Sequence, residues 1–211
     1  MTFTIFVVDD DPGVLKALSR RLRVKGYAVE AFASPHEFLA LHDPAIAGCA
    51  LLDVFMPDLD GLELQRALTM GGFQRPVIFL TGQGDIPMSV RAMRAGAIDF
   101  LTKPVADDAL LEAIARAVQT DADCRRKRVE RDAARARLTT LTPREREVLT
   151  HVVAGRLNKQ IAYDLGTVEQ TIKVHRRRVM EKLGVRTILD LSRLMAVVGI
   201  PNGEPTDPAL H

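Results

Sequence analysis

The sequence predicts two domains of different class, an α/β domain followed by an all-α domain. In the first half, short apolar runs alternate with helical patterns five times, which is typical of a parallel sheet covered by helices on both faces. A highly charged stretch without Gly or Pro follows over residues 119–141. From Thr142 onwards, apolar residues recur only at helical spacing. The 211 residues suffice for two modest domains, each with its own core.

Five β/α units account for residues 1–118. Asp11 followed by Pro12 is a typical helix start, and Gly26 is a typical residue just past a helix end. The expected strands are FTIFVV, YAVEAF, CALLD, PVIFL and AIDFL, and the expected helices cover 13–25, 35–42, a segment from Leu62, 87–95 and a segment from Asp107.

Residues 119–141 are predicted to form a charged helical linker that continues the preceding helix. They serve either as a solvated spacer or as a rod that carries a signal between domains. The sequence TPRE predicts a capping box between Thr142 and Glu145, and this box begins a second domain over residues 142–198. Its later helices are expected over 159–165, 169–183 and 188–198, and residues 199–211, rich in Pro and Gly, are expected to form a disordered tail.

Composition narrows the class of protein. Hydrophobic residues make up 47% and charged residues 27%, as in ordinary folded, soluble chains. No apolar run approaches the roughly 18 residues of a membrane span, and the chain starts with a strand-like run rather than a basic leader. We therefore expect a cytoplasmic protein without a membrane partner. Cys49 and Cys124 lie too far apart for a CxxC site and are expected to be inert thiols.

The two halves differ in charge although the net charge is only +2. Residues 1–118 contain 11 Lys and Arg against 15 Asp and Glu, whereas residues 119–211 contain 18 against 12. A basic second half indicates an anionic partner for that half alone, or a basic surface that serves only solubility.

Polar side chains follow four of the predicted strands at the point where each ends. In an open α/β sheet the binding crevice lies at this edge. Singly, an Asp at a strand end is more often a helix cap or turn residue, as we expect for Asp11. The set consists of Asp9, Asp10 and Asp11 after the first strand, Asp53 after the third, Thr81 after the fourth and Lys103 after the fifth.

Together these residues predict a phosphoryl-binding site. Three carboxylates that converge on one crevice repel one another, and a divalent cation with oxygen ligands such as Mg²⁺ relieves that repulsion. One carboxylate then acts as nucleophile, the metal and Lys103 neutralise charge on the phosphoryl oxygens, and Thr81 donates a hydrogen bond to one of them.

The motifs VVDDDP, LLDVFMPDLDG, FLTGQGD and DFLTKP resemble those of the receiver domains of bacterial two-component response regulators over residues 1 to about 118. The resemblance implies a CheY-like (flavodoxin-like) fold with a five-stranded parallel sheet. It also implies that Asp53 is the phosphoacceptor, with Thr81 and Lys103 as phosphoryl contacts and a cis peptide before Pro104.

The same resemblance implies a Mg²⁺ site and a conformational switch. Asp9, Asp10, Asp53 and the main-chain carbonyl of Phe55 are the implied metal ligands. Phe100 is the implied aromatic switch, which turns inward as Thr81 moves; the alternative is a Phe that is always buried in the core.

The 169–183 helix has one apolar side and one basic side. At about 100° per residue, Ile172, Val179 and Leu183 fall together, and Lys173, Val174, Arg177 and Arg178 fall largely opposite them. A preceding short helix and a turn that starts at Gly166 complete a helix-turn-helix arrangement, whose second helix enters the major groove of double-stranded DNA. Basic amphipathic helices also bind membranes or acidic partner helices.

The runs LTPREREVLTHVVAGRLNKQIAYDLG and TIKVHRRRVMEKLGV resemble the four-helix LuxR-type DNA-binding domain of the FixJ/NarL family of response regulators, over most of residues 138–198. The resemblance implies base-facing positions at Lys173, Val174 and Arg177. It places phosphate contacts at Thr171, Arg176, Arg178, Asn158 and Lys159.

Three further positions in this domain carry expectations. His175 faces obliquely towards the apolar side, which favours a packed, hydrogen-bonded histidine. Thr167 and Val168 depart from the family pattern, and a capping box between Thr167 and Gln170 would start the helix one residue early. The stripe Ile188, Leu191, Met195 and Val198 either forms the family's dimer contact on DNA or packs inside the bundle.

The predicted function is that of a response regulator. A cognate histidine kinase phosphorylates Asp53, the receivers form a homodimer, and two DNA-binding domains occupy adjacent major grooves to regulate transcription. A phosphatase that uses Asp9 and Asp11 is the competing enzyme hypothesis. It requires Thr or Val where the chain has Gly13, so we predict that the chain is not an enzyme. A DNA-binding protein independent of phosphorylation is the third hypothesis.

Overall fold

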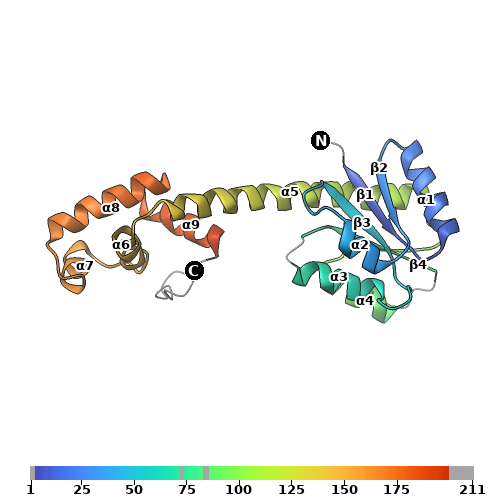
Figure 1. The fold of residues 1–211 in the computed structure, drawn as a ribbon, viewed down its shortest axis with the longest axis horizontal. Coiled ribbons are helices and arrows are strands. Elements are labelled where there is room, and N and C mark those ends of the chain that lie inside the picture. The colour runs from blue at the N-terminus through green and yellow to red at the C-terminus, as the bar shows by residue number, and fades with distance from the viewer. Residues whose placement is uncertain (1–2, 72–73, 83–85, 200–211) are drawn as a thin grey trace. The chain divides into compact units, whose positions relative to one another are not determined.

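A computed structural model describes residues 3–71, 74–82 and 86–199, and the chain divides into two compact units between Arg125 and Arg126 (Figure 1). Among these residues no helix has the length and apolar character needed to cross a bilayer. The last twelve residues of the predicted tail, and Gln83–Asp85 of the FLTGQGD motif, lie outside the described residues.

The first unit is built on a parallel sheet of five strands in the order β2-β1-β3-β4-β5. Because the order reverses between β1 and β3, their carboxyl ends flank the crevice of the sheet. The predicted α/β class is confirmed. The strands are β1 (Thr4–Val8), β2 (Ala28–Phe32), β3 (Gly48–Asp53), β4 (Val77–Thr81) and β5 (Asp99–Thr102).

Helices cover both faces of this sheet. The strands alternate between two cores, so that Phe6 and Val8 of β1 point to one face and Ile5 and Val7 to the other. The first core includes side chains of α2, α3 and α4, and the second includes side chains of α1 and α5. Burial on both faces explains why the central strands β1, β3 and β4 are nearly continuous apolar runs. The helices are α1 (Pro12–Val24), α2 (Pro35–Leu41), α3 (Gly61–Met70), α4 (Ile86–Arg94) and α5 (Asp107–Thr139).

Local signals set the helix ends largely as predicted. The Asp11 carboxylate accepts hydrogen bonds from the backbone N–H groups of Gly13 and Val14, and Pro12 is the first helical residue of α1. β5 starts two residues later than predicted, because the N–H of Ala97 donates to the carbonyl of Ala92 and closes the end of α4.

The second unit packs the helices α6 (Pro143–Val153), α7 (Asn158–Asp164), α8 (Glu169–Leu183) and α9 (Ile188–Val198) around one core. The capping box between Thr142 and Glu145 is confirmed. The predicted box between Thr167 and Gln170 is wrong: Val168 is the N-cap of α8, without a side-chain cap bond, and the helix starts at Glu169. The core comprises Leu141, Val148, Leu149, Val152, Ile161, Ala162, Ile172, Val179, Leu183, Leu191 and Met195.

Helix α5 belongs to both units, as the prediction of a helical linker requires. In the first unit it remains packed as far as Arg125, whose Nε lies 2.7 Å from the buried Asp121 and whose Nη1 donates to the carbonyl of Ala45 at 2.8 Å. In the second unit, Arg137 near its end donates to the carbonyl of Leu183 at 3.3 Å. The middle of α5 and its last turns are therefore each held by a side-chain to backbone contact within their own unit.

Candidate functional site

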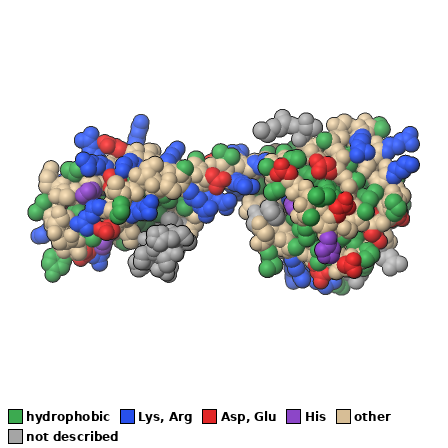
Figure 2. Space-filling view, in the orientation of Figure 1, with side chains coloured by type: hydrophobic (Ala, Val, Ile, Leu, Met, Phe, Trp, Pro, Cys, Tyr) green, Lys and Arg blue, Asp and Glu red, His purple; other side chains and the backbone are tan. Residues whose placement is uncertain are grey.

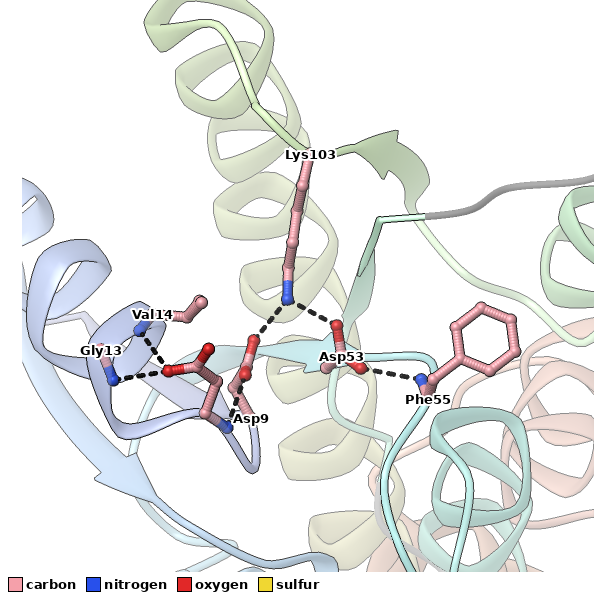
Figure 3. Close-up of polar contacts among 7 residues, drawn as sticks. Asp9, Gly13, Val14, Asp53, Phe55 and Lys103 are labelled. Atoms are coloured by element: carbon pink, nitrogen blue, oxygen red, sulfur yellow. Dashed lines mark hydrogen bonds and ion pairs between the residues drawn. The ribbon is translucent and has the colours of Figure 1, made fainter.

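The candidate site lies where β1, β3, β4 and β5 end. The Lys103 ammonium lies between two carboxylates, 2.6 Å from Oδ2 of Asp9 and 2.6 Å from Oδ1 of Asp53 (Figure 3). Asp9 is 2% exposed, Asp53 7% and Thr81 0%. Four of the predicted site residues, from four strands, therefore meet in one largely buried place.

Backbone N–H groups hold both carboxylates from the other side. Oδ2 of Asp53 accepts from the N–H of Phe55 at 2.8 Å, and Oδ1 of Asp9 accepts from the N–H of Asp11 at 3.0 Å. These contacts fix the rotamers of the two carboxylates, since each bonds the loop directly after its own strand. The Lys103–Pro104 peptide bond is cis, as the resemblance implies.

Burial and neighbouring charges shift the pKa values of the central pair. Burial raises the pKa of the Asp53 carboxyl, and although Lys103 opposes this, the nearby charge of Asp9 adds to it. For Lys103, burial alone would lower the pKa, but the hydrogen bonds and charges of Asp53 and Asp9 outweigh burial and raise it. Lys103 therefore stays positively charged beside Asp53.

The donor set suits a hard divalent cation, although only part of the predicted metal set comes together. Within residues 3–71, 74–82 and 86–199, no three His, Cys, Asp or Glu side chains form a group that could hold a metal ion. Asp10 is exposed. Asp9 and Asp53 nevertheless both reach the Lys103 ammonium, so their carboxylate oxygens lie close together. Carboxylate oxygens are the ligands that Mg²⁺ prefers.

Thr81 is joined to this centre through the backbone, and Phe100 lies on the strand that precedes Lys103. The backbone N–H of Lys103 donates to the carbonyl of Thr81 at 2.6 Å, so the ends of β4 and β5 are joined at the site. Phe100 is half-buried and its ring centroid is 6.1 Å from that of Phe79. The ring thus touches the core but remains partly exposed.

One contact beside the site carries no sequence signal. Arg21 of α1 donates from Nη2 to the carbonyl of Val105 at 2.9 Å and forms an ion pair with Asp107. It thereby holds the loop that follows Lys103. The two ends of the hydrogen bond are 84 residues apart, so no local pattern could have indicated it.

In the second unit, α8 presents the basic surface that the sequence predicts. Ile172, Val179 and Leu183 are buried, whereas Lys173, Val174, Arg177 and Arg178 are exposed, and Figure 2 shows Lys and Arg side chains over the part of this unit where α8 lies.

Several of these side chains already have partners. Lys173 lies 3.3 Å from Glu169, and Arg177 lies 2.7 Å from Glu181. Arg176 is partly buried and donates to Oδ1 of Asn158 at 3.0 Å, which ties α8 to the start of α7. Thr171 is also partly buried, whereas Lys159 is exposed.

The structure also describes His175 and the apolar stripe of α9. His175 is packed, but its buried Nδ1 has no hydrogen-bond partner within the described part of the chain, so the predicted hydrogen bond is missing at that atom. In the α9 stripe, Leu191 and Met195 pack inside the core, whereas Ile188 is exposed.

A buried ion pair in this unit escaped the sequence analysis. Glu145, which is 3% exposed, lies 2.6 Å from Lys182 of α8. The hydrogen bonds from Lys182 and from the backbone of Thr142 lower the pKa of Glu145 to about 2. The predicted capping box assigned Glu145 to the start of α6. Its ion pair with Lys182, 37 residues away, could not be predicted from any local sequence pattern.

Comparison with known proteins agrees with both units. Residues 5–115 match the family "Response regulator receiver domain", and residues 139–195 match "Bacterial regulatory proteins, luxR family". The transcriptional regulatory protein FixJ of Rhizobium meliloti is 43% identical over 201 residues, which cover 93% of this chain and 96% of FixJ. Nodulation protein W of Bradyrhizobium diazoefficiens is 42% identical over 198 residues, 93% of this chain and 86% of that protein.

Solved structures show the same relationship. The response regulator StyR superimposes with a TM-score of 0.74 and 44% identity, covering 93% of this chain and 99% of the StyR chain. Full-length FixJ from B. japonicum gives a TM-score of 0.56 with 36% identity, covering 96% and 100% of the two chains. The chain therefore belongs to the response regulators of two-component systems that join a receiver domain to a LuxR-type DNA-binding domain.

Proposed function

We propose that Asp53 accepts a phosphoryl group from a cognate histidine kinase and that this controls DNA binding by the second unit. The observation that carries the proposal is the Lys103 ammonium, which lies 2.6 Å from both Asp9 and Asp53 in a largely buried site. A buried carboxylate beside a fixed cation and a hydroxyl is suited to forming an acyl phosphate.

The phosphoryl transfer forms one bond and breaks one. An oxygen of Asp53 attacks the phosphorus, the bond between phosphorus and the kinase histidine nitrogen breaks, and its electron pair returns to the imidazole. Lys103 neutralises charge on the phosphoryl oxygens and Thr81 donates a hydrogen bond to one of them. Bound Mg²⁺, held by Asp9, Asp10, Asp53 and the carbonyl of Phe55, would supply further neutralisation.

Phosphorylation would then change the face formed by α4, β5 and α5. We expect Thr81 to move towards the phosphoryl group and Phe100 to turn inward. The backbone N–H of Lys103, the residue after β5, donates to the carbonyl of Thr81, which links the ends of β4 and β5. Exposed apolar residues on α4, at Ile86, Val90 and Met93, support a homodimer contact there.

The dimer would present two copies of α8 to adjacent major grooves, about one helical turn apart. Lys173, Val174 and Arg177 would face bases, since they lie opposite the buried side of the helix. Phosphates would be bound by Thr171, Arg176, Arg178, Asn158 and Lys159. Contacts to phosphates supply affinity, and contacts to bases supply sequence choice.

We extend the proposal to the whole chain. The receiver occupies residues 1–118, the charged helical linker 119–141 and the DNA-binding domain 142–198. The protein acts in the cytoplasm without a membrane partner. It takes up a phosphoryl group as a signal and is not an enzyme.

The test is phosphorylation in vitro. The full-length protein is incubated with Mg²⁺ and acetyl phosphate, and intact mass and sedimentation are measured for wild type, Asp53→Asn and Asp58→Asn. Asp58 is an exposed aspartate of the same loop with φ 70°, a conformation that Asn also adopts, so it is a matched control. We expect one added phosphoryl group and a shift to dimer in wild type and Asp58→Asn only.

An unmodified wild type would contradict the phosphoacceptor role. A gel shift with and without acetyl phosphate then tests the hypothesis of a DNA-binding protein that is independent of phosphorylation. Such a protein should shift DNA equally under both conditions.

A further inference from the structure

The exposed face of α8 includes one polar residue that the DNA contacts above leave out. Gln170 lies in the first turn of α8 and is exposed. Val174 follows one turn later and Arg177 two turns later, so the three share one face. The buried Ile172 and Val179 lie on the other side of the helix.

The side-chain amide of Gln170 is available for a ligand. The sequence left open a capping box with Thr167, which would have engaged this amide at the helix start. In the structure Val168 is the N-cap and makes no side-chain cap bond. The described residues provide no hydrogen bond to the Gln170 amide, and its exposure leaves both its donor and its acceptor free to meet another molecule.

The charges around Gln170 favour recognition of bases over general attraction to DNA. Two of the exposed cations of α8, Lys173 and Arg177, each have a carboxylate one turn away, at Glu169 and Glu181. These exposed ion pairs are weak and can be exchanged for DNA contacts. The two carboxylates nevertheless repel phosphates, so the middle of the face depends on its neutral residues, Gln170 and Val174.

We propose that Gln170 reads an adenine in the major groove, with Val174 against the methyl group of a neighbouring thymine. A glutamine amide matches adenine in both directions, since it donates to N7 and accepts from the N6 amino group, and an aliphatic side chain suits the thymine methyl. The inference rests on the proposed entry of α8 into the major groove and adds an A·T preference to the contacts of Lys173 and Arg177.

Selection from random-sequence duplex DNA tests this directly. Full-length wild type, Gln170→Ala and Gln170→Glu are incubated with Mg²⁺ and acetyl phosphate, and the bound DNA is sequenced. We expect a fixed adenine in each half-site for wild type and a loss of that preference of about tenfold for Gln170→Ala. Gln170→Glu should prefer cytosine at the same position, because a carboxylate accepts from the N4 amino group of cytosine. A merely structural role predicts no such change of base.

Two other variants separate this inference from the proposed function. Gln119→Ala removes a glutamine on α5, whose amide lies 3.3 Å from Asp123, and should leave the selected sequence unchanged. Arg178→Ala should weaken binding to all sequences alike, as loss of a phosphate contact does. If wild type selects a sequence and both Gln170 variants select the same one, the role of Gln170 is wrong and the α8 contacts stand. If wild type selects no sequence, the proposed DNA recognition itself fails.

Discussion

At Gly61, the first residue of α3, the lack of a side chain allows the helix to approach the backbone of Asp53 closely. A Cβ atom there would lie 2.3 Å from the carbonyl oxygen of Asp53 and 3.1 Å from the ring of Phe79. The N–H of Gly61 also donates to the carbonyl of Val54 at 3.0 Å. The backbone of Asp53 is thus positioned by a contact that only glycine permits.

Gly61→Ala should therefore destabilise the receiver by about 1–3 kcal/mol, because backbone atoms rather than a flexible side chain must move. Urea unfolding measures the loss of stability, and the rate of phosphorylation by acetyl phosphate measures the effect of the backbone movement on Asp53. Gly82→Ala is the control, since a Cβ at Gly82 meets nothing within 4 Å and should leave the unfolding midpoint unchanged. Equal midpoints for both variants would refute the close approach.

The two cysteines should differ in reactivity. Cys49 is fully buried in β3, and burial raises the pKa of its thiol to about 12, whereas Cys124 is partly exposed. A thiol reagent needs the thiolate, so at neutral pH the folded protein should be labelled at Cys124 and not at Cys49. Peptide mass mapping after brief labelling decides this. Denatured protein, in which both thiols react, provides the reference, and equal labelling in the folded protein would contradict the burial of Cys49.

Helices α6 and α8 are joined by the buried pair of Glu145 and Lys182. Since the pKa of Glu145 is lowered to about 2 in the folded protein, the pair stabilises it fully above the ordinary carboxyl pKa. This stabilisation is lost as the pH falls from about 4.5 towards 2. Acid should therefore loosen the contact between α6 and α8.

Glu145→Gln should lower stability at pH 6 by about 2 kcal/mol, less than for a fully buried pair because Lys182 is partly exposed. Thermal unfolding followed by circular dichroism should show this difference shrinking as the pH approaches 3. Glu147→Gln, which removes an exposed partner of Arg144, should differ little from wild type at either pH. A difference for Glu145→Gln that stays constant with pH would argue against ionisation as its cause.

Helix α5 illustrates what sequence analysis could and could not predict. Its start at Asp107 and its continuation through the charged stretch followed from composition and periodicity. The contact that holds α5 against the rest of the first unit could not be predicted, because Arg125 donates to the carbonyl of Ala45, which lies 80 residues earlier in the chain. The acidic site was predictable because its residues lie at or directly after the ends of strands, and parallel strands bring their carboxyl ends together. The ion pairs of Lys173 and Arg177 depend on rotamers that no pattern reports.

Arg125→Ala should loosen the part of α5 that lies beyond the first core. Hydrogen exchange should become faster in residues 118–125 and 43–46, because Arg125 also donates to the carbonyl of Ile46. The expected loss of stability is about 1–2 kcal/mol. Arg128→Ala is the matched control, since Arg128 only approaches Asp132 at 3.9 Å on the exposed side of the same helix. Unchanged hydrogen exchange in Arg125→Ala would contradict a stabilising role of Arg125 in this part of α5.

Acidic and basic residues are distributed unevenly between the two halves of the chain. Residues 1–118 carry more acidic than basic groups, and residues 119–211 the reverse. DNA affinity should therefore fall steeply with salt, by about a thousandfold between roughly 50 and 200 mM if the phosphate contacts form as proposed. Fluorescence anisotropy at several salt concentrations gives the slope, and Arg178→Ala should reduce it by about one for each domain bound. A slope equal to that of wild type would place Arg178 away from the phosphates.

The lysine bridge between Asp9 and Asp53 bears on the common genetic shortcut of replacing a phosphorylated aspartate with glutamate. Without a phosphoryl group, the Lys103 ammonium is already bonded to Asp9 and Asp53. A phosphoryl group on Asp53 would therefore have to replace one of these contacts in order to bind Lys103. A glutamate at position 53 brings the same single negative charge on a longer arm, and Lys103 can pair with it as it does with Asp53. If Asp53 accepts the phosphoryl group as proposed, Asp53→Glu should therefore behave like the unphosphorylated protein.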